Sequence, residues 1–133
     1  MSETDRPSGA GLRGIGDRHR VLLLWLPVVV WAAVIFAFSS VPDLGTGLGG
    51  WDLVLRKIAH TAEYAILGAL LLRATGRIGV ALTLGIAYAV SDELHQTFVP
   101  GRAGKPLDVA IDTLGLVCGI AAWHVLRSRR EPA

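Results

Sequence analysis

Four long apolar stretches, separated by short segments rich in polar residues, glycine and proline, set the pattern of this chain. The first, residues 21–38, is interrupted only by Pro27, and the others cover residues 53–72, 79–98 and 107–126. A helix of about 20 residues is about 30 Å long, which matches the hydrocarbon core of a bilayer. The pattern therefore predicts an all-α protein with four transmembrane helices.

The segments between these stretches contain residues that end or begin helices. Gly76 lies in the second connection, where glycine suits the left-handed conformation that ends many helices. Pro106 directly precedes the fourth stretch, and proline fits the first position of a helix because the N–H that it lacks is not needed there. Residues 41–50 carry one proline and four glycines, so we expect a loop there.

Composition supports a membrane protein. Hydrophobic residues make up 52% of the chain and charged residues 18%, whereas soluble domains carry about a quarter charged residues. The single cysteine, Cys118, excludes an internal disulfide, and we expect it to be buried in the fourth helix. No nucleic-acid-binding motif accompanies the basic residues, so no nucleic-acid partner is predicted.

Basic residues gather at one end of the predicted helices, and such residues stay on the cytoplasmic side of a membrane. Nine arginines lie there: Arg6, Arg13, Arg18, Arg20, Arg73, Arg77, Arg127, Arg129 and Arg130. The opposite end holds Arg56, Lys57, Arg102 and Lys105. We therefore expect both termini in the cytoplasm, with a disordered polar tail at residues 1–17 before a membrane domain at 18–130. The first stretch exceeds the core of about 7–15 apolar residues typical of a cleavable leader, so we expect it to be retained.

Ionisable residues interrupt the second, third and fourth stretches. An ionisable group near the bilayer centre costs about 2.5–3.5 kcal/mol, so such groups are rare and by default mark functional sites. Eight of them occur here: Lys57, His60, Glu63, Asp92, Glu93, His95, Asp108 and Asp112. We therefore predict a functional site inside the membrane domain.

Depth and helical face place the polar residues together. With the N-terminus inside, the polar residues of the second, third and fourth helices all fall in the outer half of the bilayer. On each helix they share an arc of about 140° or less. The members are Lys57, His60, Glu63 and Tyr64 on the second helix, Ser91, Asp92, His95 and Gln96 on the third, and Asp108 and Asp112 on the fourth. Glu93 lies off this face by about 60° and is expected to contact a neighbouring helix. We predict one water-accessible polar pocket that opens outward.

These residue types suit acid–base chemistry and anion binding. The candidate catalytic residues are His60, Glu63, Asp92, His95, Asp108 and Asp112. The candidate substrate-binding residues are Lys57, Tyr64, Ser91, Glu93, Gln96 and Arg102. Histidine and carboxylates also bind divalent metals, and the sequence does not decide whether a metal is present. The structural alternative is a set of buried hydrogen bonds that hold the helices together.

In several motifs the chain resembles the VanZ-like family of bacterial membrane proteins. The similarity covers about residues 36–119. Its motifs are Phe38-Ser39-Ser40 followed by Pro42, KIAHTAEY from Lys57 to Tyr64, SDELHQ from Ser91 to Gln96, Pro100-Gly101-Arg102, and DVAIDTLG from Asp108 to Gly115. The resemblance implies an association with low-level resistance to teicoplanin-type glycopeptides, although most members have no assigned reaction. The chain departs at Asp112, where the family pattern favours asparagine, so its site carries one additional acid.

Three functions fit these observations. The first is an enzyme that acts on a lipid-linked or cell-envelope substrate, which the convergence of histidine and carboxylates slightly favours. The second is a non-catalytic protein that binds or shields an envelope component or a glycopeptide. The third is a small transporter, for which four helices without an inverted repeat are few. Bilayer lipids are a partner in each case, and the oligomeric state stays undecided.

Overall fold

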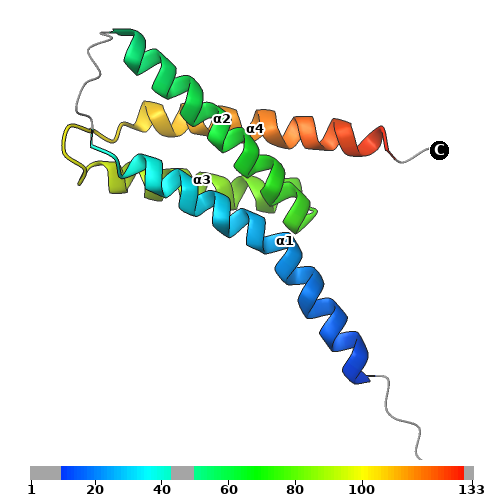
Figure 1. The fold of residues 1–133 in the computed structure, drawn as a ribbon. Helices are drawn as coiled ribbons and strands as arrows, with labels where there is room; N and C mark the ends of the chain where they lie inside the picture. Colours follow the sequence, from blue (N-terminus) through cyan, green and yellow to red (C-terminus); the bar gives the residue numbers. More distant parts are fainter. Residues whose placement is uncertain (1–9, 43–49, 131–133) are drawn as a thin grey trace, which may run out of the picture.

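The computed structural model describes residues 10–42 and 50–130, which form four α-helices (Figure 1). They are α1 (Ala10–Ser39), α2 (Gly50–Thr75), α3 (Ile78–Gln96) and α4 (Pro106–Ser128). No strand occurs in the described residues. The predicted all-α class with four helices is therefore confirmed.

The helix boundaries follow the expected signals at two places and extend beyond the apolar pattern at another. Gly76 ends α2 with a φ of 66°, and Pro106 occupies the first turn of α4. Residues 10–17, which we expected in the tail, belong to α1. A helix that is already nucleated gains one hydrogen bond for each added residue, so it can continue from an apolar segment into a polar one. Residues 1–9 of the tail and 43–49 of the predicted loop lie outside the described residues.

Small residues allow α2 and α4 to pack closely, and these two helices form the most extensive contact of the bundle. A Cβ atom built on Gly115 would lie 2.5 Å from the carbonyl oxygen of Thr61. One built on Gly119 would overlap the backbone of Ala65. The spacing Gly115-x-x-x-Gly119 is the small-residue pattern that brings helix backbones together in membranes. The backbones therefore touch where any larger residue would push them apart.

Large apolar side chains cover much of the outer surface. On α1, Leu22, Leu23 and Val29 are between 61% and 67% exposed, whereas the core holds only a few apolar residues of each helix. Soluble monomers rarely expose an apolar surface of this extent. Two segments, Arg18–Ser39 and Pro106–Ser128, are long and apolar enough to cross a membrane. Cys118 is exposed and not buried as we expected, because it lies at the edge of the α2–α4 contact, beside the glycines that pack against α2.

One end of the bundle gathers the C-terminal ends of α1 and α3 and the N-terminal ends of α2 and α4 (Figure 1). Arg102, in the connection between α3 and α4, ties this end to α1. Its Nε donates to the carbonyl oxygen of Val41 at 2.9 Å, and a terminal nitrogen donates to that of Phe38 at 3.1 Å. The Phe38 carbonyl also accepts from the backbone N–H of Val41 at 3.2 Å, so Arg102 adds a second bond there and holds the residues that follow α1. The N-terminal half of α1 extends away from the other helices (Figure 1).

We predict that Gly119→Ala lowers the free energy of unfolding by about 1–3 kcal/mol, because the added methyl group must displace the backbone of α2. Thermal unfolding of the detergent-solubilised protein measures this effect. Gly79→Ala is the matched control, since a Cβ atom there meets nothing within 4 Å. The control should unfold at the same temperature as the original protein or slightly higher, and equal losses in both variants would contradict close packing at Gly119.

Candidate functional site

Five ionisable residues from three helices meet inside the bundle, and we call them the acid–histidine cluster: His60 and Glu63 of α2, Asp92 and Glu93 of α3, and Asp112 of α4. His60 is at the centre. Its Nδ1 lies 3.2 Å from Glu63 Oε2. Its Nε2 lies 3.5 Å from Asp92 Oδ2 and 3.6 Å from Asp112 Oδ2. The structure thus brings together residues that the sequence placed on three separate helix faces.

Asp92 is held by donors from three directions, all on the same carboxylate oxygen. Its Oδ2 accepts hydrogen bonds from Ser39 Oγ at 2.7 Å, from Gln96 Nε2 at 3.1 Å and from the Tyr64 hydroxyl at 3.4 Å. Asp92 is 2% exposed and Tyr64 is fully buried. Ser39 was not among the predicted site residues. The only signal for it was the motif Phe38-Ser39-Ser40, to which we assigned no role.

Glu93 points toward the start of α4, a neighbouring helix. Its Oε2 accepts a hydrogen bond of 3.0 Å from the backbone N–H of Lys105, the residue that precedes α4. Its Oε1 accepts one of 3.4 Å from Gln96 Nε2. A carboxylate at a helix N-terminus is stabilised by the free N–H groups and the helix dipole. Glu93 therefore links α3 to the residue that precedes α4.

Several atoms of the cluster have no hydrogen-bond partner among the described residues. They are His60 Nε2, Asp92 Oδ1 and both carboxylate oxygens of Asp112, and all are buried. Asp112 as a residue is 1% exposed. Buried polar groups in native proteins almost always have a partner, so each of these atoms needs an explanation. Ligand atoms of His60, Glu93 and Asp112 also lie within 4.8 Å of one another, which is an arrangement able to hold a metal ion.

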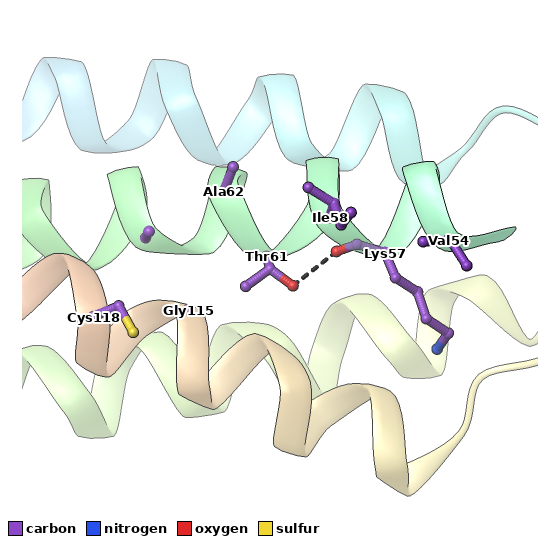
Figure 2. A pocket seen from close by; sticks show the side chains of 8 residues that line it. Val54, Lys57, Ile58, Thr61, Ala62, Gly115 and Cys118 are labelled. Atoms are coloured by element: carbon purple, nitrogen blue, oxygen red, sulfur yellow. Dashed lines mark hydrogen bonds between the residues drawn. The ribbon is translucent and has the colours of Figure 1, made fainter. Parts of the chain in front are cut away.

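Lys57 and Asp108 form an ion pair at the rim of the bundle rather than joining the cluster. Their side chains are 37% and 22% exposed. Figure 2 shows Lys57 leaving α2 in the direction of α4, whose first turn contains Asp108. The pair links α2 and α4 and neutralises one of the acids that the sequence placed at this end.

Three further predicted site residues lie apart from the cluster. The ring of His95 stacks on Phe36 of α1 with a centroid separation of 4.3 Å, and its Nε2 lies 3.0 Å from Ser40 Oγ. Ser91 is exposed and donates to the carbonyl oxygen of Tyr88 in its own helix. Arg102 bonds to α1, as described above, and to Gln96 Oε1 at 3.4 Å. Of the two histidines among the candidate catalytic residues, only His60 contacts the buried acids.

A cavity of about 440 Å³ lies on the surface between α2 and α4, and we call it the α2–α4 groove (Figure 2). No residue of the acid–histidine cluster lines it. Thr61 donates its hydroxyl proton to the carbonyl oxygen of Lys57 at 2.7 Å, so its polar group is already paired. The residues that line the α2–α4 groove are Val54, Lys57, Ile58, Thr61, Ala62, Ala65, Gly115 and Cys118. The groove is therefore mainly apolar, with one cation at its end.

Comparison with known proteins finds one family. The VanZ/LLP1 family model matches residues 20–127, which include the whole acid–histidine cluster and most of each helix. No curated protein and no solved structure matches the chain. The match agrees with the resemblance of the sequence motifs to VanZ-like proteins.

Ser39→Ala removes the shortest hydrogen bond to the buried oxygen of Asp92, so we predict a loss of about 1–3 kcal/mol in the free energy of unfolding. Gln96 and Tyr64 still donate to that oxygen, so we expect the loss in free energy of unfolding to lie toward the lower end of this range. Thermal unfolding in detergent measures it. Ser128→Ala is the control, because that hydroxyl is exposed and bonds only within its own helix at 2.9 Å. Equal unfolding temperatures for the two variants would show that the Ser39–Asp92 bond does not stabilise the fold.

Proposed function

This chain belongs to the VanZ/LLP1 family, and from that premise we propose that it is a multi-pass membrane protein that acts on a lipid-linked component of the cell envelope. The acid–histidine cluster is the proposed site. One observation carries the proposal: buried acids from α3 and α4, together with the half-buried Glu63 of α2, surround a single imidazole at one level of the bundle. Such groups are expensive inside a membrane and are kept where they serve a function.

All four helices cross the membrane in this proposal, including α2 and α3, whose polar residues interrupt their apolar stretches. The acids of α3 are buried, while Val90 and Leu94 of the same helix are 51% and 60% exposed. Ile58 and Ile66 of α2 are exposed in the same way. Both helices therefore present apolar side chains outward and polar ones inward, which suits contact with lipid. The arginine distribution places both termini in the cytoplasm and the cluster in the outer half of the bilayer.

Positive charge near the cluster suits a phosphate-containing headgroup. Lys57, Arg102 and Lys105 all lie at the end of the bundle that faces outward in this orientation. Arginine and lysine bind phosphate through charge-assisted hydrogen bonds. The α2–α4 groove, with Lys57 at its end, provides an apolar surface for a hydrocarbon chain. A lipid-linked substrate combines these two features, so it fits better than a water-soluble molecule.

A second candidate function is non-catalytic binding that shields an envelope component or a glycopeptide. The depth of the acids favours it, because Asp92 and Asp112 are only 2% and 1% exposed, and a substrate reaches them only if side chains move. Incubation of the purified protein with a lipid-linked envelope precursor separates the two functions. Product in excess of one equivalent per protein chain indicates an enzyme, and a stable complex without product indicates a binder.

Single cysteines test the proposed orientation. In a Cys118→Ala background, we predict that Thr97→Cys reacts with a membrane-impermeant maleimide in intact cells, because residue 97 follows α3 at the outer end. Ser128→Cys, at the other end of α4, should react only after the membrane is permeabilised. The Cys118→Ala background without a new cysteine should stay unlabelled. The reverse pattern, with Ser128→Cys labelled in intact cells, would overturn the orientation.

Glycopeptide tolerance tests the proposed function. We expect expression of this protein in a teicoplanin-susceptible host to raise the minimal inhibitory concentration, and Asp92→Asn or His60→Gln to return it to that of the empty vector. Both substitutions change a group at the centre of the cluster while conserving side-chain size. His124→Gln is the control, since His124 is exposed near the opposite end of α4. Full tolerance with either cluster variant, at equal abundance in the membrane, would contradict the proposal.

A further inference from the structure

We propose that the acid–histidine cluster binds one divalent transition-metal ion, with Nε2 of His60 and the carboxylates of Glu93 and Asp112 as its protein ligands. The inference deepens the proposed function and rests on it, because the ion lies where we place the headgroup of the substrate. It is carried by the unpartnered buried atoms of the cluster and by the way their neighbours hold them.

His60 presents an unprotonated ring nitrogen to the cluster when its ring is neutral. Nδ1 lies 3.2 Å from a carboxylate oxygen of Glu63, which only accepts when ionised, so the neutral imidazole carries its proton on Nδ1. Nε2 then presents a lone pair. The atoms without partners are therefore all acceptors: Nε2 of His60, Oδ1 of Asp92 and both oxygens of Asp112. A cation satisfies such a set, because it is attracted to every acceptor at once.

A second proton on His60 satisfies the set poorly. A doubly protonated His60 offers one N–H at Nε2 to two carboxylates, at 3.5 and 3.6 Å. Those separations exceed the range of about 2.7–3.2 Å for a well-formed N–H···O bond. Oδ1 of Asp92 and Oδ1 of Asp112 would still lack a donor among the described residues. An imidazolium therefore leaves two buried oxygens unpaired.

The spacing of the candidate ligands suits a metal. Two ligands that each lie about 2.1 Å from a tetrahedral ion are about 3.4 Å apart. Nε2 of His60 and Oδ2 of Asp112 are 3.6 Å apart, and the ligand atoms of His60, Glu93 and Asp112 all lie within 4.8 Å of one another. Small side-chain rotations bring the three onto one ion. Asp92 then lies beside the ion, held through Oδ2 by its three donors, and its Oδ1 is left to accept a proton.

Neighbouring groups already orient these ligands as the neighbours of metal ligands do. Metal-binding histidines usually donate their other ring N–H to a carboxylate, which fixes the ring and raises the basicity of the ligating nitrogen. Glu63 accepts from His60 in this way. The backbone N–H of Lys105 donates to Oε2 of Glu93, and Gln96 Nε2 donates a longer bond of 3.4 Å to Oε1. His60 is therefore held through Nδ1 and Glu93 mainly through Oε2, whereas both oxygens of Asp112 are left for the ion.

The donor set indicates the class of metal. One imidazole and two carboxylates suit borderline or moderately hard divalent ions, such as Zn²⁺ or Mn²⁺. Copper(I) prefers thiolate or thioether ligands, and Cys118 lines the α2–α4 groove rather than the cluster. A charge of +2 also offsets the carboxylates that would otherwise repel one another in the bundle.

Titration of the chelator-stripped protein in detergent with Zn²⁺, Mn²⁺ or Mg²⁺, followed by calorimetry, tests the site. We expect one Zn²⁺ or Mn²⁺ per chain and a higher unfolding temperature in its presence. Asp112→Asn and Glu93→Gln should abolish both effects, and Glu63→Gln, which only orients His60, should weaken binding by about 10–100-fold. His124→Gln is the matched control and should bind as the original protein does. If Asp112→Asn fails to fold, Glu63→Gln carries the test, since it leaves all three ligands in place.

Absence of binding at millimolar Zn²⁺ and Mn²⁺ would overturn the metal site, and so would equal affinity in the original protein and all three cluster variants. These outcomes are distinct from failure of the proposed function. If no metal binds but His60→Gln still abolishes teicoplanin tolerance, the function stands and the metal site falls. If one metal ion binds to the cluster but the variants keep full tolerance, the metal site stands and the proposed function falls.

Discussion

The burial of carboxylates inside an apolar helix bundle is the constraint on which the rest of this structure depends. An ionised carboxylate away from water is stable only when it is paired, hydrogen-bonded or bound to a cation. Asp92 meets this requirement through Ser39, Tyr64 and Gln96, which come from α1, α2 and α3. The polar faces of these helices must therefore meet, and their apolar faces turn outward.

Close contact between α2 and α4 makes this arrangement possible. Glycines remove the side chains that would separate the two backbones, and Gly115 touches Thr61, which directly follows His60 in α2. In α4, Asp112 precedes Gly115 by about one helical turn. The contact therefore sets the distance between His60 and Asp112. The packing of small residues between α2 and α4 therefore determines the geometry of the acid–histidine cluster.

The sequence predicted four helices, as the structure has them, but it did not predict the neighbours of each side chain. Helical periodicity assigned His60, Asp92 and Asp112 to one polar face of each helix, and the structure joins them. The same periodicity grouped His95 with Asp92, yet His95 stacks on Phe36. An arc of about 140° on one helix can face two different neighbours, so a shared face does not imply a shared partner.

The pattern of residues along the chain predicts the number and apolar character of the helices, the turns at Gly76 and Pro106, and the residue types gathered near one end. These features depend on local backbone preferences and on the period of the pattern, which are properties of short segments. The packing of the helices alone reveals that Ser39 holds Asp92, that Lys57 pairs with Asp108, and that both oxygens of Asp112 lack a donor among the described residues. Those outcomes depend on how whole helices rotate against one another, which is set by packing between residues far apart in the chain.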